Sequence, residues 1–112
     1  MEPTTTHIVV VITASSNREA ETIANALVES RLAACVNIIS AGVCSLFWWQ
    51  GAIERQDEVL MLVKSRSDLL PSVVEVVKGL HSYTVPEVIA LPILAGSSDY
   101  LLWVDSSLPQ TS

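Results

Sequence analysis

The sequence predicts an α+β fold, a ferredoxin-like βαββαβ sandwich with an extended hairpin and a short C-terminal helix. The first observation behind this prediction is the order of hydrophobic patterns along the 112 residues, which switch between a period of 2 and a period of 3.6. The second is composition. Half of the residues are hydrophobic and only 16% are charged, against about 25% in an average soluble chain. Since a chain of this length buries only about two thirds of its unfolded surface, the apolar surplus favours a symmetric oligomer.

The first strand and helix lie in the N-terminal third of the chain. Residues His7–Thr13 read HIVVVIT, a run of branched aliphatic residues that is typical of a strand buried on both faces. Ser16, followed three residues later by Glu19, forms a capping box, and apolar residues then recur at spacings of three and four up to about Arg31. The pattern predicts an amphipathic helix with this apolar side: Ala20, Ile23, Ala24, Leu27 and Val28.

Two long β-prone stretches follow and predict the extended hairpin. The first covers Ala34–Trp49, and its Ala41-Gly42 interruption indicates a bulge or a bend. The second is the return strand, Glu54–Arg66. Between them, Gln50-Gly51 suits a two-residue turn in which the glycine adopts a positive φ. Such a hairpin projects beyond a compact core, which again favours neighbouring subunits.

The second helix is predicted between residues 67 and 79. Ser67 and Asp68 are N-cap candidates, and Pro71 is tolerated in a first helical turn. Gly79 suits a C-terminal cap. The apolar stripe of this helix consists of Leu70, Val73, Val74 and Val77.

The C-terminal part of the sequence predicts a loop over residues 81–86, a strand over Glu87–Leu94 and a short helix through Leu102–Val104. Pro92 favours an edge position or a bulge for this strand, because proline cannot donate to a sheet ladder. One domain and two flexible ends are therefore expected, with the domain over residues 8–105 and the ends at 1–7 and 106–112.

Charge and targeting patterns exclude several function classes. Six Lys and Arg are scattered along the chain and stand against twelve Asp and Glu, which gives a net charge of −6. Nucleic acids bind clustered basic residues, so we expect no nucleic acid and no anionic membrane as a partner. No signal-peptide pattern and no apolar run of membrane-spanning length is visible, which predicts a cytoplasmic protein. The sequence contains no recognisable nucleophile motif, so we do not expect an enzyme.

Two cysteines, Cys35 and Cys44, are expected to be buried structural thiols. On one regular strand they would lie roughly 30 Å apart, whereas a disulfide needs Cα atoms within about 7 Å. Only a tight reversal near Gly42 would bring them together.

The strongest candidate for cation binding is the loop that contains His81, Tyr83 and Glu87. An imidazole and a carboxylate can hold a divalent cation, and imidazole suits copper, nickel and zinc. Tight sites use three or four ligands, so further ligands would come from elsewhere in the fold or from another subunit. The alternative is that His81 satisfies a turn and that Glu87 pairs with Lys64 or an arginine.

A second candidate group lies on the return strand. The even spacing of Glu54, Glu58 and Lys64 places them on one face of a regular strand. They can line a subunit boundary, where buried charges must be paired, or form a solvated strand edge. The neighbouring Trp48-Trp49 pair can stack on a ligand, although aromatic residues are also enriched at subunit interfaces.

Four stretches together resemble the CutA family of divalent-cation tolerance proteins. They are RLAACVNI (Arg31–Ile38), the hairpin segment from Trp48 to Ser65, HSYTVPEVIALPI (His81–Ile93) and YLLWV (Tyr100–Val104). The resemblance covers nearly the whole chain from about Ile8, in order and without large gaps. It implies a ferredoxin-like fold, a tightly packed homotrimer and unusual heat resistance.

The resemblance also implies a role in copper and divalent-cation tolerance, with weak cation binding that folding does not require and with copper as the favoured ion. The family's metal site is associated with a cysteine on the first strand, a histidine in a loop and a glutamate shortly after it. Here the histidine and the glutamate match His81 and Glu87, and the cysteine position falls at about Ile12.

The trimeric build of the family is similar to that of the PII signalling proteins. This similarity implies an alternative function, a regulator or scaffold that binds a small molecule or a protein in the cleft between subunits. The candidate cleft residues, besides His81, are Trp49, Glu54, Glu58, Lys64 and Tyr83.

Overall fold

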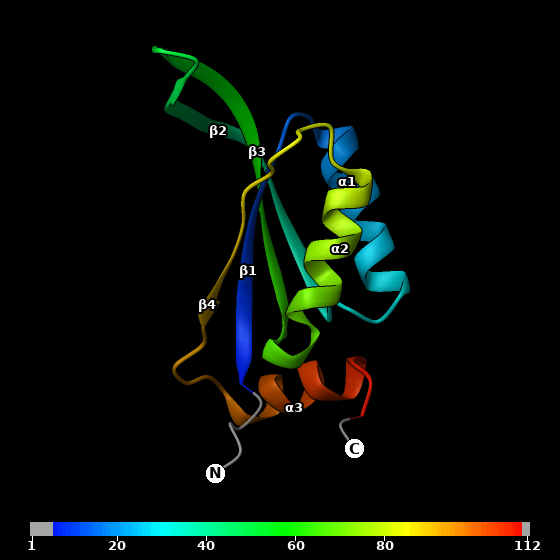
Figure 1. The fold of residues 1–112 in the computed structure, drawn as a ribbon. Coiled ribbons are helices and arrows are strands. Elements are labelled where there is room, and N and C mark those ends of the chain that lie inside the picture. Colours follow the sequence, from blue (N-terminus) through cyan, green and yellow to red (C-terminus); the bar gives the residue numbers. More distant parts are fainter. Residues whose placement is uncertain (1–5, 111–112) are drawn as a thin grey trace.

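The computed structural model describes residues 6–110 and has the predicted order of elements (Figure 1). The elements are β1 (His7–Ala14), α1 (Asn17–Glu29), β2 (Cys35–Trp49), β3 (Ala52–Arg66), α2 (Leu70–Leu80), β4 (Val88–Pro92) and α3 (Ser98–Ser107). A 3-10 turn over Ser67–Leu69 directly precedes α2. The four strands form one antiparallel sheet in the order β2-β3-β1-β4. The predicted α+β, ferredoxin-like fold is thus confirmed.

One face of the sheet forms the core with α1 and α2, which lie together on one side of the strands in Figure 1. Strand pairing places Ile38, Met61, Ile12 and Val88 in one row across the four strands, and Val36, Val63, Val10 and Ala90 in the next row. Central members such as Ile12, Val10 and Met61 are fully buried against the helices. The helices therefore cover this face of the sheet.

The opposite face, here called the open face, is also apolar. Its central row consists of Asn37, Leu62, Val11 and Ile89, and the flanking rows contribute Ile39, Leu60, Val9 and Leu91. Asn37, Ile39, Ile89 and Leu91 are exposed in the single chain, and the others are half-buried. Within residues 6–110 no helix packs there, because α1 and α2 lie on the other side of the sheet (Figure 1).

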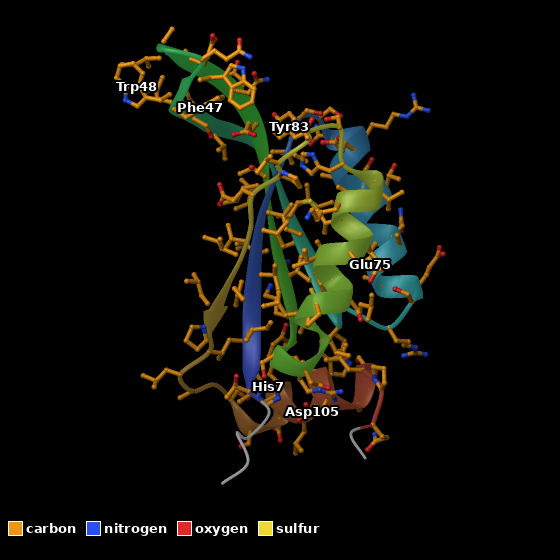
Figure 2. The ribbon with its side chains drawn as sticks, in the orientation of Figure 1. His7, Phe47, Trp48, Glu75, Tyr83 and Asp105 are labelled. Carbon is orange, nitrogen blue, oxygen red and sulfur yellow. The ribbon has the colours of Figure 1, made fainter. Side chains whose placement is uncertain are left out.

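The β2–β3 hairpin extends past the end of the sheet (Figure 1). A register shift between Ile39 and Val43, with Gly42 at φ +88°, confirms the predicted bulge. The tip turns at Gln50 and Gly51, and both residues have a positive φ, as a tight type I′ hairpin turn requires. Phe47 and Trp48 project near the tip in Figure 2, and Trp48 is 73% exposed.

The overall dimensions reflect this extension of the hairpin. The radius of gyration is 14.9 Å, whereas about 13 Å is expected for a compact chain of roughly 100 residues. The principal extents are 46 × 31 × 26 Å. The tip carries large exposed apolar side chains, such as Trp48 and Ile53, that are not among the residues packed against the core.

Several boundaries and environments differ from the sequence-based expectations. Gly79 lies inside α2 instead of capping it, and His81 follows as the C-cap residue with an extended backbone. The fourth strand is shorter than expected because it ends at Pro92, an edge residue that cannot donate to the ladder. Cys35 and Cys44 are free, but Cys44 is exposed, because it lies on the hairpin beyond the helices. The expectation of two buried thiols is thus wrong for Cys44, and Cys35 is only half-buried.

The far end of the sheet is held by a polar network around Arg66, a residue that is almost fully buried. Its guanidinium pairs with Asp68 at 3.0 Å, lies 3.9 Å from Asp105 in α3 and donates to the carbonyl of Pro109. His7 contacts Asp105 at 3.0 Å, at the end opposite the hairpin (Figure 2). The regular elements thus extend to His7 and Ser107, beyond the expected limits of the domain, because this network joins β1, β3 and α3. The flexibility expected for residues 1–5 and 111–112 concerns residues outside the described part of the chain.

None of the helices within residues 6–110 has the length and hydrophobicity to cross a membrane.

The packing of α1 gives a stability prediction. Leu27→Ala should destabilise the protein by about 2–5 kcal/mol, because the Leu27 side chain is fully buried and its removal leaves a cavity. Denaturant unfolding at one fixed protein concentration measures this. The matched control is Val28→Ala on the same helix, where the side chain is 44% exposed and a change within about 0.5 kcal/mol is expected. Equal losses for both variants would contradict the assigned helix face.

Candidate functional site

The candidate site is centred on His81, directly after the end of α2. The His81 side chain is 0% exposed. Its Nε2 lies 2.7 Å from the backbone carbonyl of Thr13 at the end of β1. The backbone N–H of Tyr83 donates to Nδ1 over 3.0 Å. The imidazole therefore fastens the loop between α2 and β4 onto the first strand.

The two backbone partners of His81 fix its tautomer. A carbonyl can only accept, so Nε2 must carry the proton toward Thr13, and an N–H can only donate, so Nδ1 must offer its lone pair to Tyr83. Glu19 Oε1 lies 3.6 Å from Nδ1, but that nitrogen is occupied by the Tyr83 N–H. The ring in this arrangement is neutral, and both of its nitrogens are used.

Glu19 joins the same site from the first turn of α1. Its Oε1 accepts from the backbone N–H and the hydroxyl of Ser15 at 3.0 and 3.1 Å, and its Oε2 accepts from the backbone N–H of Ser82 at 2.9 Å. Burial on its own raises the pKa of the Glu19 carboxyl, but the hydrogen bonds from Ser15 and Ser82 outweigh it and hold that pKa below its usual value. The carboxylate thus links the start of α1 to the His81 loop.

Sequence reasoning did not identify Glu19 as a site residue. The sequence indicated only a capping-box role for Glu19, which involves two reciprocal hydrogen bonds with Ser16. One of the two is confirmed, since Ser16 Oγ accepts from the Glu19 N–H at 3.1 Å. The Glu19 side chain, however, bonds to Ser15 and Ser82 and not back to Ser16. The sequence contained a signal for the helix cap. It contained no signal for the contact of Glu19 with Ser82, which lies 63 positions away along the chain.

Tyr83 extends the site to the hairpin. Its hydroxyl donates to Glu58 Oε2 over 3.0 Å, and its ring lies 4.7 Å from the His81 ring. Burial and the Glu58 carboxylate raise the pKa of Tyr83 to about 12, so the hydroxyl keeps its proton at neutral pH. Glu58 pairs with Val43, the first β2 residue after the bulge. Glu19, Glu58, His81 and Tyr83 together are called the histidine cluster below.

The other predicted site residues lie apart from the histidine cluster. Glu87 is exposed just before β4, and within the described part of the chain it has no ion pair with Lys64 or an arginine. Lys64 lies on the open face, in one row with Val9 and Leu91. Trp49 and Glu54 are exposed on the hairpin. Of the predicted residues, the structure thus joins His81, Tyr83 and Glu58.

The residues assigned to a metal site by the resemblance do not fit a metal in this chain. Both His81 nitrogens already have backbone partners. Ile12 has no ligand atom and is fully buried on the helix-covered face. Among residues 6–110, no group of three or more His, Cys, Asp and Glu side chains could hold a metal ion.

A hollow of about 570 Å³ lies beside the histidine cluster, where the bulge of β2 faces the start of α1. Ser15 and Asn17 line it from the α1 side, and Arg55, Asp57 and Glu58 line it from β3. The hollow therefore combines hydroxyl, amide, cationic and anionic groups at one place.

Comparison with known proteins gives one consistent family. The family model of the CutA1 divalent ion tolerance protein matches residues 8–107. The divalent-cation tolerance protein CutA of Thermus thermophilus is 52% identical over 96 residues, which cover 86% of this chain and 92% of that protein. Its counterpart in Archaeoglobus fulgidus is 46% identical over 102 residues, covering 91% and 98%. The crystal structure of CutA1 from Oryza sativa superposes with a TM-score of 0.90 at 40% identity, covering 95% of this chain and 96% of that one.

The lowered pKa of Glu19 gives a prediction on pH dependence. The unfolded carboxyl takes up its proton near pH 4.5 and the folded one at lower pH, so this group's contribution to stability is complete above pH 4.5 and is lost as the pH falls further. Glu19→Gln should therefore lower the melting temperature at pH 7 and lessen its decline below pH 4.5. Thermal unfolding over a pH series measures both effects. Glu21→Gln, an exposed position on the same helix, is the control and should behave like the unmodified protein; equal behaviour of both variants would contradict the assignment.

Proposed function

Because the chain belongs to the CutA1 divalent ion tolerance protein family, we propose that it acts in the response to divalent cations as a homotrimer. The observation that carries the trimer is the open face, where seven apolar residues on four strands form one surface, with Asn37 at its β2 edge and Lys64 in a flanking row: Val9, Val11, Ile39, Leu60, Leu62, Ile89 and Leu91. Soluble monomers rarely expose a contiguous apolar surface of this kind. Copies of the same chain arranged around a threefold axis would cover it.

The exposed hairpin supports the same assembly. Leu46, Trp48 and Ile53 project into solvent in the single chain, and aromatic residues are enriched in the cores of subunit interfaces. A neighbouring copy would remove these side chains from water. Burial on this scale also supports the proposed heat resistance, because hydrophobic burial is the main favourable term in association.

Weak cation binding is the second element of the proposal. The chain has twelve Asp and Glu and a net charge of −6, which favours association with cations through oxygen ligands. Imidazole and thiolate ligands select copper more strongly than oxygen ligands do, and the buried His81 ring is already occupied by Thr13 and Tyr83. We therefore propose binding that includes copper but is weak and has little selectivity for it.

The alternative function is a regulator that binds a small molecule between subunits. The hollow beside the histidine cluster favours it, because it is large enough for a small ligand. Arg55 in its lining can pair with an anion, and Glu58, which accepts from the Tyr83 hydroxyl, also lines it. A scaffold that binds protein partners would instead use the exposed hairpin surface.

We also propose that the protein is not an enzyme and that it is cytoplasmic. His81, the buried histidine of the chain, has both nitrogens bonded to backbone groups and is therefore not free to act as a general base. The two cysteines are free thiols, which suits a reducing compartment. Fractionation of the native cell tests the location.

The proposed trimer gives a mutational prediction. Leu62→Lys places a charge in the central row of the open face, where desolvating it between subunits is costly. Light scattering should show three copies of the 12.1 kDa chain for the unmodified protein and a smaller mass for the variant. The control Val28→Lys adds the same charge on the outer side of α1 and should remain trimeric. A monomeric unmodified protein, or a trimeric Leu62→Lys protein, would contradict the proposal.

One calorimetric experiment separates the two candidate functions. Cu(II), Zn(II), nucleotides and simple anions are titrated into the intact protein. The proposal of weak cation binding predicts shallow titration curves for Cu(II) and Zn(II), with heats of similar size, and no saturable binding of nucleotides. Saturable binding of a nucleotide or an anion, accompanied by a higher melting temperature, would instead support the alternative function, a regulator that binds a small molecule. Copper binding far tighter than zinc binding would contradict the weak, unselective site.

A further inference from the structure

We infer that His81 in this chain is a positioning residue that joins the α2–β4 loop to β1, and not a metal ligand. The argument begins with the lone pairs of the ring. Because Nε2 donates its proton to the Thr13 carbonyl, the only lone pair of the neutral ring is on Nδ1, and the Tyr83 N–H points at it. A cation at either nitrogen must therefore displace a backbone hydrogen bond.

The surroundings of the ring supply no replacement for these hydrogen bonds. The His81 side chain is fully buried, so neither the Thr13 carbonyl nor the Tyr83 N–H could turn to water after displacement. A buried polar group left without a partner is strongly unfavourable. The native hydrogen bonds thus oppose coordination by His81.

The ring also lacks companion ligands. Ile12, at the family's cysteine position, carries only a hydrocarbon side chain and is buried in the core. Glu87 is exposed before β4. The carboxylate nearest to Nδ1 is Glu19 at 3.6 Å, and both of its oxygens already accept hydrogen bonds, from Ser15 and Ser82. A tight site needs three or four ligands together.

The same hydrogen bonds give His81 a structural role. By holding the backbone of Tyr83, the ring sets the Tyr83 hydroxyl onto Glu58. Glu58 lies opposite Val43, where the hairpin resumes after its bulge, and Figure 2 shows Tyr83 close to the base of the hairpin. His81 thereby fixes the hairpin relative to β1 through one loop.

The test is nuclear magnetic resonance of the imidazole nitrogens in the full-length, nitrogen-15-labelled protein during a Zn(II) titration. For His81 we expect one protonated nitrogen, Nε2, one unprotonated nitrogen, Nδ1, and no change in either as Zn(II) is added. His7 is the internal reference for the chemical shifts of the ring nitrogens, because its side chain is 24% exposed and is bonded to Asp105, outside the histidine cluster. A saturable Zn(II)-dependent shift of either His81 nitrogen, or a tautomer protonated on Nδ1, would overturn the inference.

Variants test the positioning role separately. His81→Gln can still donate to the Thr13 carbonyl, but its acceptor oxygen lies one bond farther along the side chain than Nδ1 and is displaced from the Tyr83 N–H. Amide hydrogen exchange should then become about tenfold faster at Tyr83 and at the base of the hairpin, while the Cu(II) and Zn(II) heats stay unchanged. Glu87→Gln, the control, should change neither.

Loss of saturable cation binding in His81→Gln would overturn the inference, and so would unchanged exchange at Tyr83 in the same variant. None of these results bears on the mass of the assembly. Failure of this inference is therefore distinguishable from failure of the proposed trimer.

Discussion

The structure depends on one constraint: a single antiparallel sheet whose two faces are both apolar. α1 and α2 cover the rows that pass through Ile12 and Val10, whereas the rows through Val11 and Val9 remain on the open face. Removing apolar surface from water is the dominant favourable term in folding and in association. The strands that form the core with one face thus require a partner on their other face. The high hydrophobic content and the proposed trimer are both consistent with this requirement.

Polar chemistry is concentrated where the hairpin leaves the sheet. There the neutral imidazole of His81 bonds to the backbone of Thr13 and Tyr83, and the Tyr83 phenol, with a raised pKa, donates to Glu58. The Glu19 carboxylate, with a lowered pKa, accepts from Ser15 and Ser82 beside them. Satisfied networks of this kind make a buried arrangement specific. In this protein the network holds the loop and the hairpin together, and membership of a divalent-cation tolerance family does not by itself make His81 a ligand.

The sequence was sufficient for the fold because each element carried a local signal. The aliphatic run around Val10 and Val11, the Ser16 cap and the Gln50-Gly51 turn all act within a few residues, and the family resemblance was confirmed by comparison. The site was harder to predict. The bond from His81 to Thr13 spans 68 positions and involves a backbone carbonyl, which no sequence pattern records. The exposure of Cys44 depends on how far the hairpin extends past the helices, which composition does not reveal.

The most direct test of the central claim is a crystal structure of the full chain. The account predicts three copies around a threefold axis, with Val11, Leu62 and Ile89 of each copy buried by the others. A lattice in which this face of the sheet lies in solvent, together with a monomeric mass in solution, would contradict it.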